Sequence, residues 1–133
     1  MSRATTSLRF ARAISRIALA APFIAGGVEY FRDRKAREEL VRNLGYPAPA
    51  AAALVDATAK VGCGLSLAAG FQPELSAAVL LANLGPMTVS VHAFWKAEDP
   101  RSQAMERNAF IGNVALAGGL LAVIAGRPSR LGR

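Results

Sequence analysis

Long apolar segments almost free of charge dominate this sequence and limit the folds open to it. Residues 75–95 contain no Asp, Glu, Lys or Arg, and neither do residues 109–125. Two further apolar segments cover residues 14–31 and 50–71. About 20 apolar residues in a helix cross the hydrocarbon core of a bilayer, which is about 30 Å thick. Because backbone groups in lipid must be satisfied internally, the sequence predicts four membrane-spanning helices.

The composition agrees with a membrane protein rather than a soluble one. Hydrophobic residues make up 53% of the 133 residues and charged residues 19%, with a mean hydropathy of +0.29. The net charge is +7, but the basic residues gather at the two ends of the chain and between apolar segments instead of along one helix face. That distribution is typical of the flanks of membrane helices, so we expect no nucleic-acid binding.

The order of these segments predicts an all-α, four-helix transmembrane antiparallel bundle. Short turns between neighbouring spans, such as the one at Gln72, favour antiparallel neighbours. Residues 32–46 have helix-like spacing of Leu, Val and Glu, which predicts a short amphipathic segment at the interface after the first helix. Its mixed Arg and Glu content suits contact with a protein, whereas its five basic residues suit anionic lipid. The transmembrane domain is expected over 14–126, between a basic N-terminal tail, 1–13, and a basic C-terminal tail, 127–133.

The basic residues of the loops give only a weak indication of orientation. With both termini inside, seven Lys and Arg residues face inward and eight face outward. The first helix usually dominates orientation, and its N-terminal flank has basic but no acidic residues. We therefore expect both termini on the cytoplasmic side of a bacterial inner (plasma) membrane. Arg16 interrupts the apolar core before Ala20, so this segment is expected to be a retained first helix rather than a cleaved signal.

Polar side chains at membrane depth are the candidates for a functional site, because burying a charge there costs about 2.5 to 3.5 kcal/mol. Asp56 and Lys60 stand four residues apart with the acid first, the favourable order for an ion pair on one helix. Either this pair is self-contained, or it lines a polar pocket that faces Glu29 or His92. The full set of candidate intramembrane polar residues is Glu29, Asp56, Lys60, Asn83, His92 and Asn113.

Two of these residues carry separate expectations. His92 lies near the aromatic end of its span, where a hydrogen-bonded structural role is more common than a proton relay. Asn113 lies deeper in its span, and an amide in hydrocarbon needs a partner on another helix.

No catalytic constellation is visible in the sequence. One His and one Cys, Cys63, supply no bis-histidine haem site, metal cluster or Cys-His nucleophile pair. The glycine pair at 118 and 119 lies in an apolar helix and is expected to serve packing. We therefore expect no catalytic residues, no metal and no cofactor bound by the chain itself, so that any redox centre belongs to a partner or to a diffusible quinone.

The segment from His92 to Leu121 resembles the closing signature of the DoxX family of small bacterial membrane proteins. It reads His-Ala-Phe-Trp, then an acidic-Pro loop, then Phe-Ile-Gly-Asn-Val-Ala-Leu-Ala-Gly-Gly-Leu-Leu. The resemblance extends from Arg16 to Leu121, but Lys60 departs from it, because the family commonly has an acidic residue just before the Gly-x-Gly pair. The signature residues, besides His92 and Asn113, are Phe94, Trp95, Pro100, Gly118 and Gly119.

This resemblance implies a role in a membrane redox complex. DoxX proteins are similar to a small subunit associated with quinol oxidase and thiosulfate:quinone oxidoreductase. Some relatives are linked to superoxide dismutase and a sulfurtransferase in oxidative-stress defence. The expected function is a non-catalytic anchor or accessory subunit for such partners within the lipid membrane. The alternative is a carrier or binding protein for a small lipophilic molecule such as a quinone or a lipid, and a homo-oligomer is possible in either case.

Overall fold

The chain folds into helices joined by short connections. The structure is a computed structural model that describes residues 3–126. Within these residues every regular element is helical, which confirms the predicted all-α class. The elements are α1 (Arg3–Arg32), α2 (Arg34–Asn43), α3 (Pro49–Ala69), α4 (Pro73–Val91), the short 3₁₀ helix η1 (Phe94–Lys96) and α5 (Pro100–Ala125).

Four of the helices have the length and hydropathy needed to cross a membrane. They cover Thr5–Arg32, Pro49–Ala69, Pro73–Lys96 and Pro100–Ala125. The fifth, α2, is the amphipathic segment expected after the first span, with 10 residues between two connections. The predicted number and order of spans are therefore confirmed.

Three helix ends differ from the predicted ones by four residues or more. α1 begins at Arg3 rather than at residue 14, because no Pro or Gly interrupts the residues that the sequence assigned to a tail. α5 begins at Pro100 rather than at residue 109, because Asp99 caps it. α4 ends at Val91, where His92 leaves helical geometry. The C-terminal tail predicted at 127–133 lies outside the described residues.

Proline and glycine mark other helix ends. Proline opens α3, α4 and α5 in the first turn, where its missing N–H has no helical partner in any case. Gly70 closes α3 in the left-handed conformation, φ 75°, and its N–H donates to the carbonyl of Leu67 at 3.1 Å. The chain reverses there within a few residues, so α3 and α4 are antiparallel neighbours.

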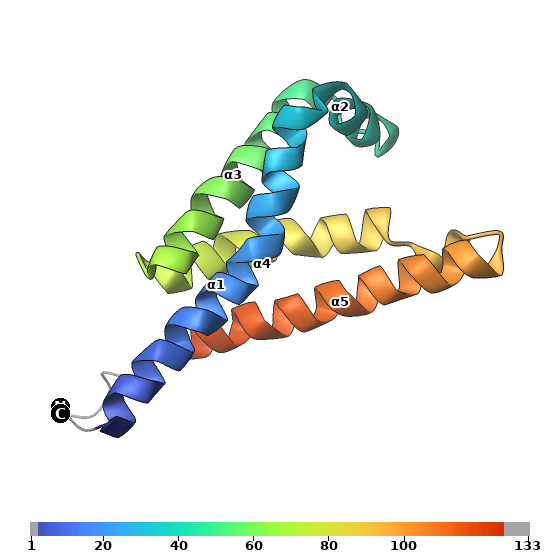
Figure 1. Ribbon diagram of the computed structural model, residues 1–133. Helices are drawn as coiled ribbons and strands as arrows, with labels where there is room; N and C mark the ends of the chain where they lie inside the picture. Colours follow the sequence, from blue (N-terminus) through green and yellow to red (C-terminus); the bar gives the residue numbers. More distant parts are fainter. Residues whose placement is uncertain (1–2, 127–133) are drawn as a thin grey trace.

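The spans form two antiparallel pairs that are inclined to each other (Figure 1). α1 packs along α3, and α4 packs along α5. The pairs meet where α3 turns into α4, and the main core lies at this crossing. A second cluster lies where α2 packs on α1 and α3, and includes Tyr30 and Val41. The main core contains Ala20, Phe23, Leu67, Ala77, Leu80, Leu84 and Leu120.

Small residues set the closest approach between helices. A Cβ added to Gly27 of α1 would meet the backbone oxygen of Ala57 on α3 at 2.8 Å. A Cβ on Gly119 of α5 would meet Leu19 of α1 at 2.5 Å, so Gly119 serves packing as predicted. Gly118 has nothing within 4 Å of its Cβ position. Close backbone contact of this kind is the usual source of helix association in lipid.

Candidate functional site

Charged and aromatic side chains fix α2 against the end of α1. Tyr30, only 2% exposed, accepts a hydrogen bond from Arg34 Nε at 3.0 Å and lies 3.3 Å from Glu38 Oε1. Arg34 also pairs with Glu38 at 3.2 Å. These contacts hold the polar helix in one position at the end of the first span.

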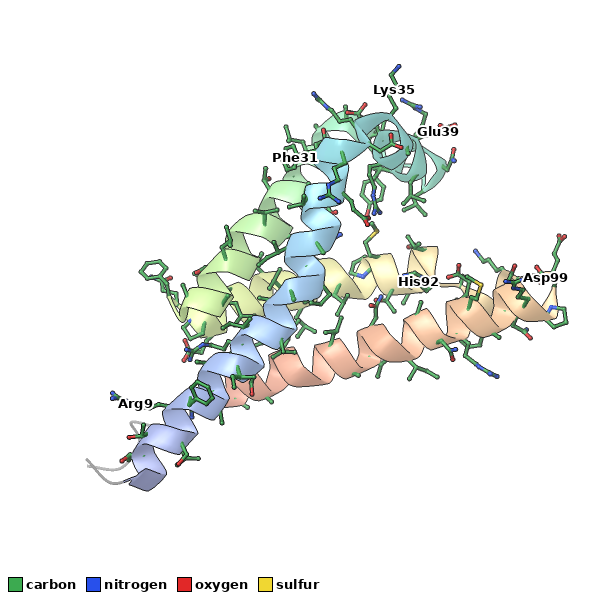
Figure 2. All side chains as sticks on the ribbon, in the orientation of Figure 1. Arg9, Phe31, Lys35, Glu39, His92 and Asp99 are labelled. Atoms are coloured by element: carbon green, nitrogen blue, oxygen red, sulfur yellow. The ribbon has the colours of Figure 1, made fainter. Side chains whose placement is uncertain are left out.

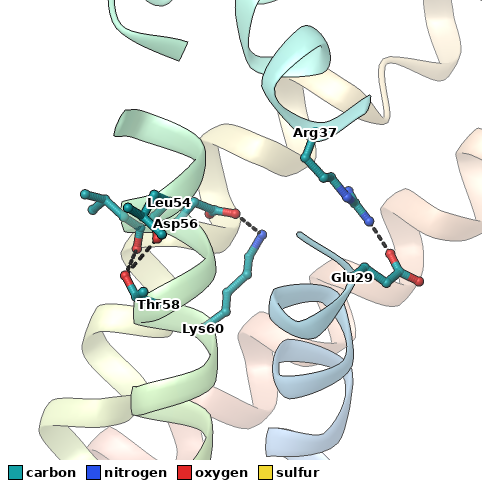
Figure 3. A network of polar contacts seen from close by, with 7 residues as sticks. Glu29, Arg37, Leu54, Asp56, Thr58 and Lys60 are labelled. Atoms are coloured by element: carbon teal, nitrogen blue, oxygen red, sulfur yellow. Dashed lines mark hydrogen bonds and ion pairs between the residues drawn. The ribbon is translucent and has the colours of Figure 1, made fainter. Parts of the chain in front are cut away.

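A second ion pair joins the same two helices. Glu29 of α1 pairs with Arg37 of α2 (Figure 3). The Glu29 carboxylate is largely exposed, as expected near the end of a span.

The hydrogen bond to Tyr30 raises the pKa of Arg34, and the attraction of Tyr30 and Glu38 raises it further. Arg34 therefore keeps its charge throughout the physiological range.

Asp56 and Lys60 form the ion pair that their spacing predicts. The Lys60 Nζ lies 2.7 Å from Asp56 Oδ2, and both side chains are mostly buried on α3 (Figure 3). Glu29 pairs with Arg37 and His92 with Glu106, so neither forms an ion pair with Asp56 or Lys60. Lys60 thus forms an ion pair with a residue of its own helix.

The hairpin of α4 and α5 is joined by two polar contacts. Asn113 Nδ2 donates to Thr88 Oγ1 at 3.0 Å, and Thr88 donates to the Leu84 carbonyl at 2.7 Å. The predicted interhelical partner of Asn113 is therefore confirmed. Closer to the loop, His92 Nδ1 lies 2.7 Å from Glu106 Oε2. Figure 2 labels His92 on the side of α4 that faces α5.

Aromatic rings close the loop end of this hairpin. Phe94 and Trp95 of η1 each make an edge-to-face contact with Phe110 of α5, at 5.6 Å and 6.1 Å between ring centroids. The Asp99 side chain accepts from the backbone N–H of Arg101 and Ser102, both at 3.0 Å, and Pro100 occupies the first turn. The signature residues of this segment therefore shape the connection between two spans.

Sequence reasoning missed Thr88 and Glu106. Glu106 lies between the apolar segments 75–95 and 109–125, and Thr88 has a small uncharged side chain. The available signal was the helix face: residues 88 and 92 stand one turn apart, and residues 106 and 113 stand two turns apart on one face of another helix. The pairing of Thr88 with Asn113 and of His92 with Glu106 depends on tertiary packing, because one turn does not match two and His92 lies past the end of α4.

A cavity lies between α2, α3 and α4. Its volume is about 300 Å³, and apolar side chains form most of its wall. Asp56 and Asn83 bring the polar atoms, and Tyr46, Pro86 and Met87 are among the apolar residues. A smaller space of about 10 Å³, the size of one water, lies between Asp56, Arg37 and Tyr30. Asp56 thus borders both spaces while it holds Lys60.

Four apolar spans define this chain as a multi-pass α-helical membrane protein. The family model of DoxX matches residues 11–93, more than half of the chain, and the protein belongs to the DoxX family. The matched segment stops before Phe94, so the residues from Phe94 to Leu121 that suggested the resemblance lie beyond it. No curated protein and no solved structure matches the chain significantly.

Proposed function

We propose that this protein is a non-catalytic accessory subunit that anchors a redox enzyme at the surface of the bacterial inner membrane. The observation that carries the proposal is the outer face of α2. Lys35, Glu39 and Arg42 stand on this face at spacings of four and three residues, and all three are exposed. Figure 2 shows Lys35 and Glu39 projecting away from the spans.

The inner face of α2 supports a role as a fixed docking element. Val41 is 8% exposed and packs with Tyr30, Ala53 and Ala57. Because Arg34 and Arg37 also tie α2 to α1, the outer charges are held in one arrangement. A fixed surface of both signs suits a protein partner with complementary charges, whereas lipid headgroups select for basic residues alone.

The polar residues inside the spans agree with this role. Asp56 pairs with Lys60, His92 with Glu106, and Asn113 with Thr88. Such pairs offset the cost of polar groups in lipid and fix helix positions. The redox character of the partner rests on the family, in which a superoxide dismutase, a sulfurtransferase or a quinone-oxidoreductase subunit is expected.

The test is purification of the tagged protein from native membranes in mild detergent, with mass spectrometry of the proteins that co-purify. We expect a redox enzyme at near-stoichiometric amounts. Reversing the charges at Lys35, Glu39 and Arg42 should release it. The control is the pair Arg101→Glu and Arg107→Glu, exposed on α5, which should retain the enzyme. Recovery without any redox enzyme would contradict the proposal.

A second function, binding of a quinone, is favoured by the cavity between α2, α3 and α4. Its volume of about 300 Å³ is at the lower end of the range for ligand pockets, and the Asn83 amide can hydrogen-bond a quinone carbonyl. The test is extraction of quinone from the purified protein. Ala82→Trp, which fills the cavity, should lower the amount recovered. Ala78→Trp, one turn away outside the lining, should not.

A further inference from the structure

A larger cavity lies at the opposite end of the molecule from α2. Its volume is about 740 Å³, between the N-terminal part of α1, the C-terminal part of α5 and the first turn of α4. Figure 1 shows these three segments together at one end. One stripe of α1, at spacings of three and four residues, forms a wall of it with Leu8, Ala11, Arg12, Ser15, Arg16 and Leu19.

The length of α1 places this cavity at a membrane surface. Twenty residues separate Arg12 from Arg32, which is about 30 Å of helix and equals the thickness of the hydrocarbon core. When Arg32 and α2 lie at one surface, Arg12 therefore lies at the other. Arg16 lies one turn deeper, within reach of the headgroups through its long side chain.

Arg16 has an unsatisfied donor at this site. Its Nε is buried and has no hydrogen-bond partner among the described residues. The guanidinium packs over Gly70, where an added Cβ would meet Nη2 at 2.9 Å, so its position is fixed by the end of α3. A buried charged donor without an acceptor is costly, and an anionic oxygen would satisfy it.

The charges of the cavity select for an anion. Arg12 and Arg16 bring two positive charges, and Glu74 brings a negative one. Glu74 forms no salt bridge within the described part of the chain, where it lies in the first turn of α4 and is favoured by the helix dipole. The net charge of the lining is therefore positive. Apart from Ser15, the rest of the wall is apolar, with Leu19 and Val123 on its inner side.

We propose that this cavity binds an anionic phospholipid of the surrounding membrane. The phosphate lies between the guanidinium groups of Arg12 and Arg16, and an acyl chain lies along Leu19 and Val123. The site is independent of the proposed anchoring function, because α2 lies at the other membrane surface.

The test uses the full chain, purified and delipidated in detergent, and native mass spectrometry with added phosphatidylglycerol or phosphatidylcholine. Phosphatidylglycerol should bind about tenfold more tightly, because both lipids carry the phosphate but the choline group of phosphatidylcholine cancels the net negative charge that the two arginines attract. Arg16→Gln should weaken phosphatidylglycerol binding about tenfold and Arg12→Gln about fivefold, and each should reduce the preference over phosphatidylcholine. Arg9→Gln on the same helix, exposed and outside the lining, should change binding less than about twofold.

A second pair of variants keeps the proposal testable if Arg16→Gln fails to fold. Ala122→Trp fills the cavity from α5 and should reduce phosphatidylglycerol binding with both arginines intact. Ala115→Trp, two turns earlier and outside the lining, should leave it unchanged. Equal affinity for the two lipids, or full binding in the arginine variants, would overturn the proposal. Displacement of the lipid by inorganic phosphate alone would assign the site to a free anion instead.

Discussion

At the level of single residues, Lys60, His92 and Asn113 are tolerated in or near the spans because each has a partner of suitable chemistry. Asn113 donates to a hydroxyl, Lys60 to a carboxylate, and His92 faces a carboxylate. Each of these partners lies either one turn away on the same helix or directly across the α4–α5 hairpin. Local pairing of this kind satisfies polar groups without water, which is what a bilayer requires.

Thr88→Val should destabilise the protein by leaving the Asn113 amide without its acceptor. The Thr88 side chain is nearly buried, and valine keeps its shape. We expect a loss of about 1 kcal/mol in the free energy of unfolding, the usual scale for interhelical hydrogen bonds in membranes. Reversible unfolding in detergent measures it. Thr58→Val is the control, because the exposed Thr58 hydroxyl bonds only to its own helix, and it should cost much less. Equal losses in the two variants would contradict the pairing.

Asp99 should make the stability of the hairpin depend on pH in the acid range. The hydrogen bonds from Ser102, and then that from Arg101, lower the pKa of Asp99 below its usual value. A lowered pKa in the folded state means that the charged cap stabilises the fold above pH about 4 and is lost as pH falls further. Asparagine keeps the cap without the charge.

Unfolding midpoints of the parent and of Asp99→Asn, compared between pH about 6 and about 3, provide the measurement. At the higher pH the parent should be more stable than Asp99→Asn, and this difference in stability should disappear at the lower pH. Asp99→Ala, which removes the cap itself, should be less stable at both pH values. A parent-to-Asn difference that stays constant with pH would refute the role of the charge.

At the scale of elements, the contact of α1 with α3 depends on backbone proximity. Gly27 lies against the Ala57 carbonyl and Val61 of α3, and Gly64 of α3 lies against Ile24 of α1. Each helix thus brings a glycine to the contact. Since lipid gives no hydrophobic force between helices, this close packing is a main source of the pair's stability.

Gly27→Ala should therefore loosen the α1–α3 pair. Its new methyl group would lie 2.7 Å from Val61 Cγ2 and 2.8 Å from a backbone oxygen that cannot rotate away. Overpacking of this kind costs about 1 to 3 kcal/mol. The matched control is Gly26→Ala, because nothing lies within 4 Å of that Cβ position. Unfolding in detergent should show a loss for the first variant only, and a similar result for both would exclude this contact as the cause.

At the scale of the whole molecule, an even number of spans puts both ends of the helical domain at one membrane surface. Figure 1 shows the start of α1 and the end of α5 together, and α2 at the far end of the α1–α3 pair. The arrangement of the two antiparallel pairs thus places the two proposed sites at opposite membrane surfaces. The charged face of α2 meets one aqueous side, and the arginine-lined cavity meets the headgroups of the other.

Labelling of single cysteines checks this separation and the predicted orientation. In a Cys63→Ser background, Glu39→Cys on α2 should react with a membrane-impermeant thiol reagent in intact cells. Arg9→Cys on α1 should react only after the membrane is opened, because we expect both termini inside. Reaction of both from the same side would contradict the fold, and a reversed pattern would contradict the orientation alone.

The sequence by itself determined the helical class, the number of spans, the amphipathic segment and the Asp56–Lys60 pair. These depend on local spacing, and the bilayer demands helices of a known length. The helix starts differ from the prediction: residues 3–13 and 100–108 are polar enough to suggest a tail and a loop, yet they form the first turns of α1 and α5.

Only the tertiary structure decided which residues from different helices meet. Glu106 joins His92, Phe110 joins the Phe94 and Trp95 pair, and Arg16 packs over Gly70. The inclination of the two helix pairs, and with it both cavities, also follows from packing. These features depend on the register and crossing of helices, which are set by the fit of side chains over many residues and leave no local pattern in the sequence.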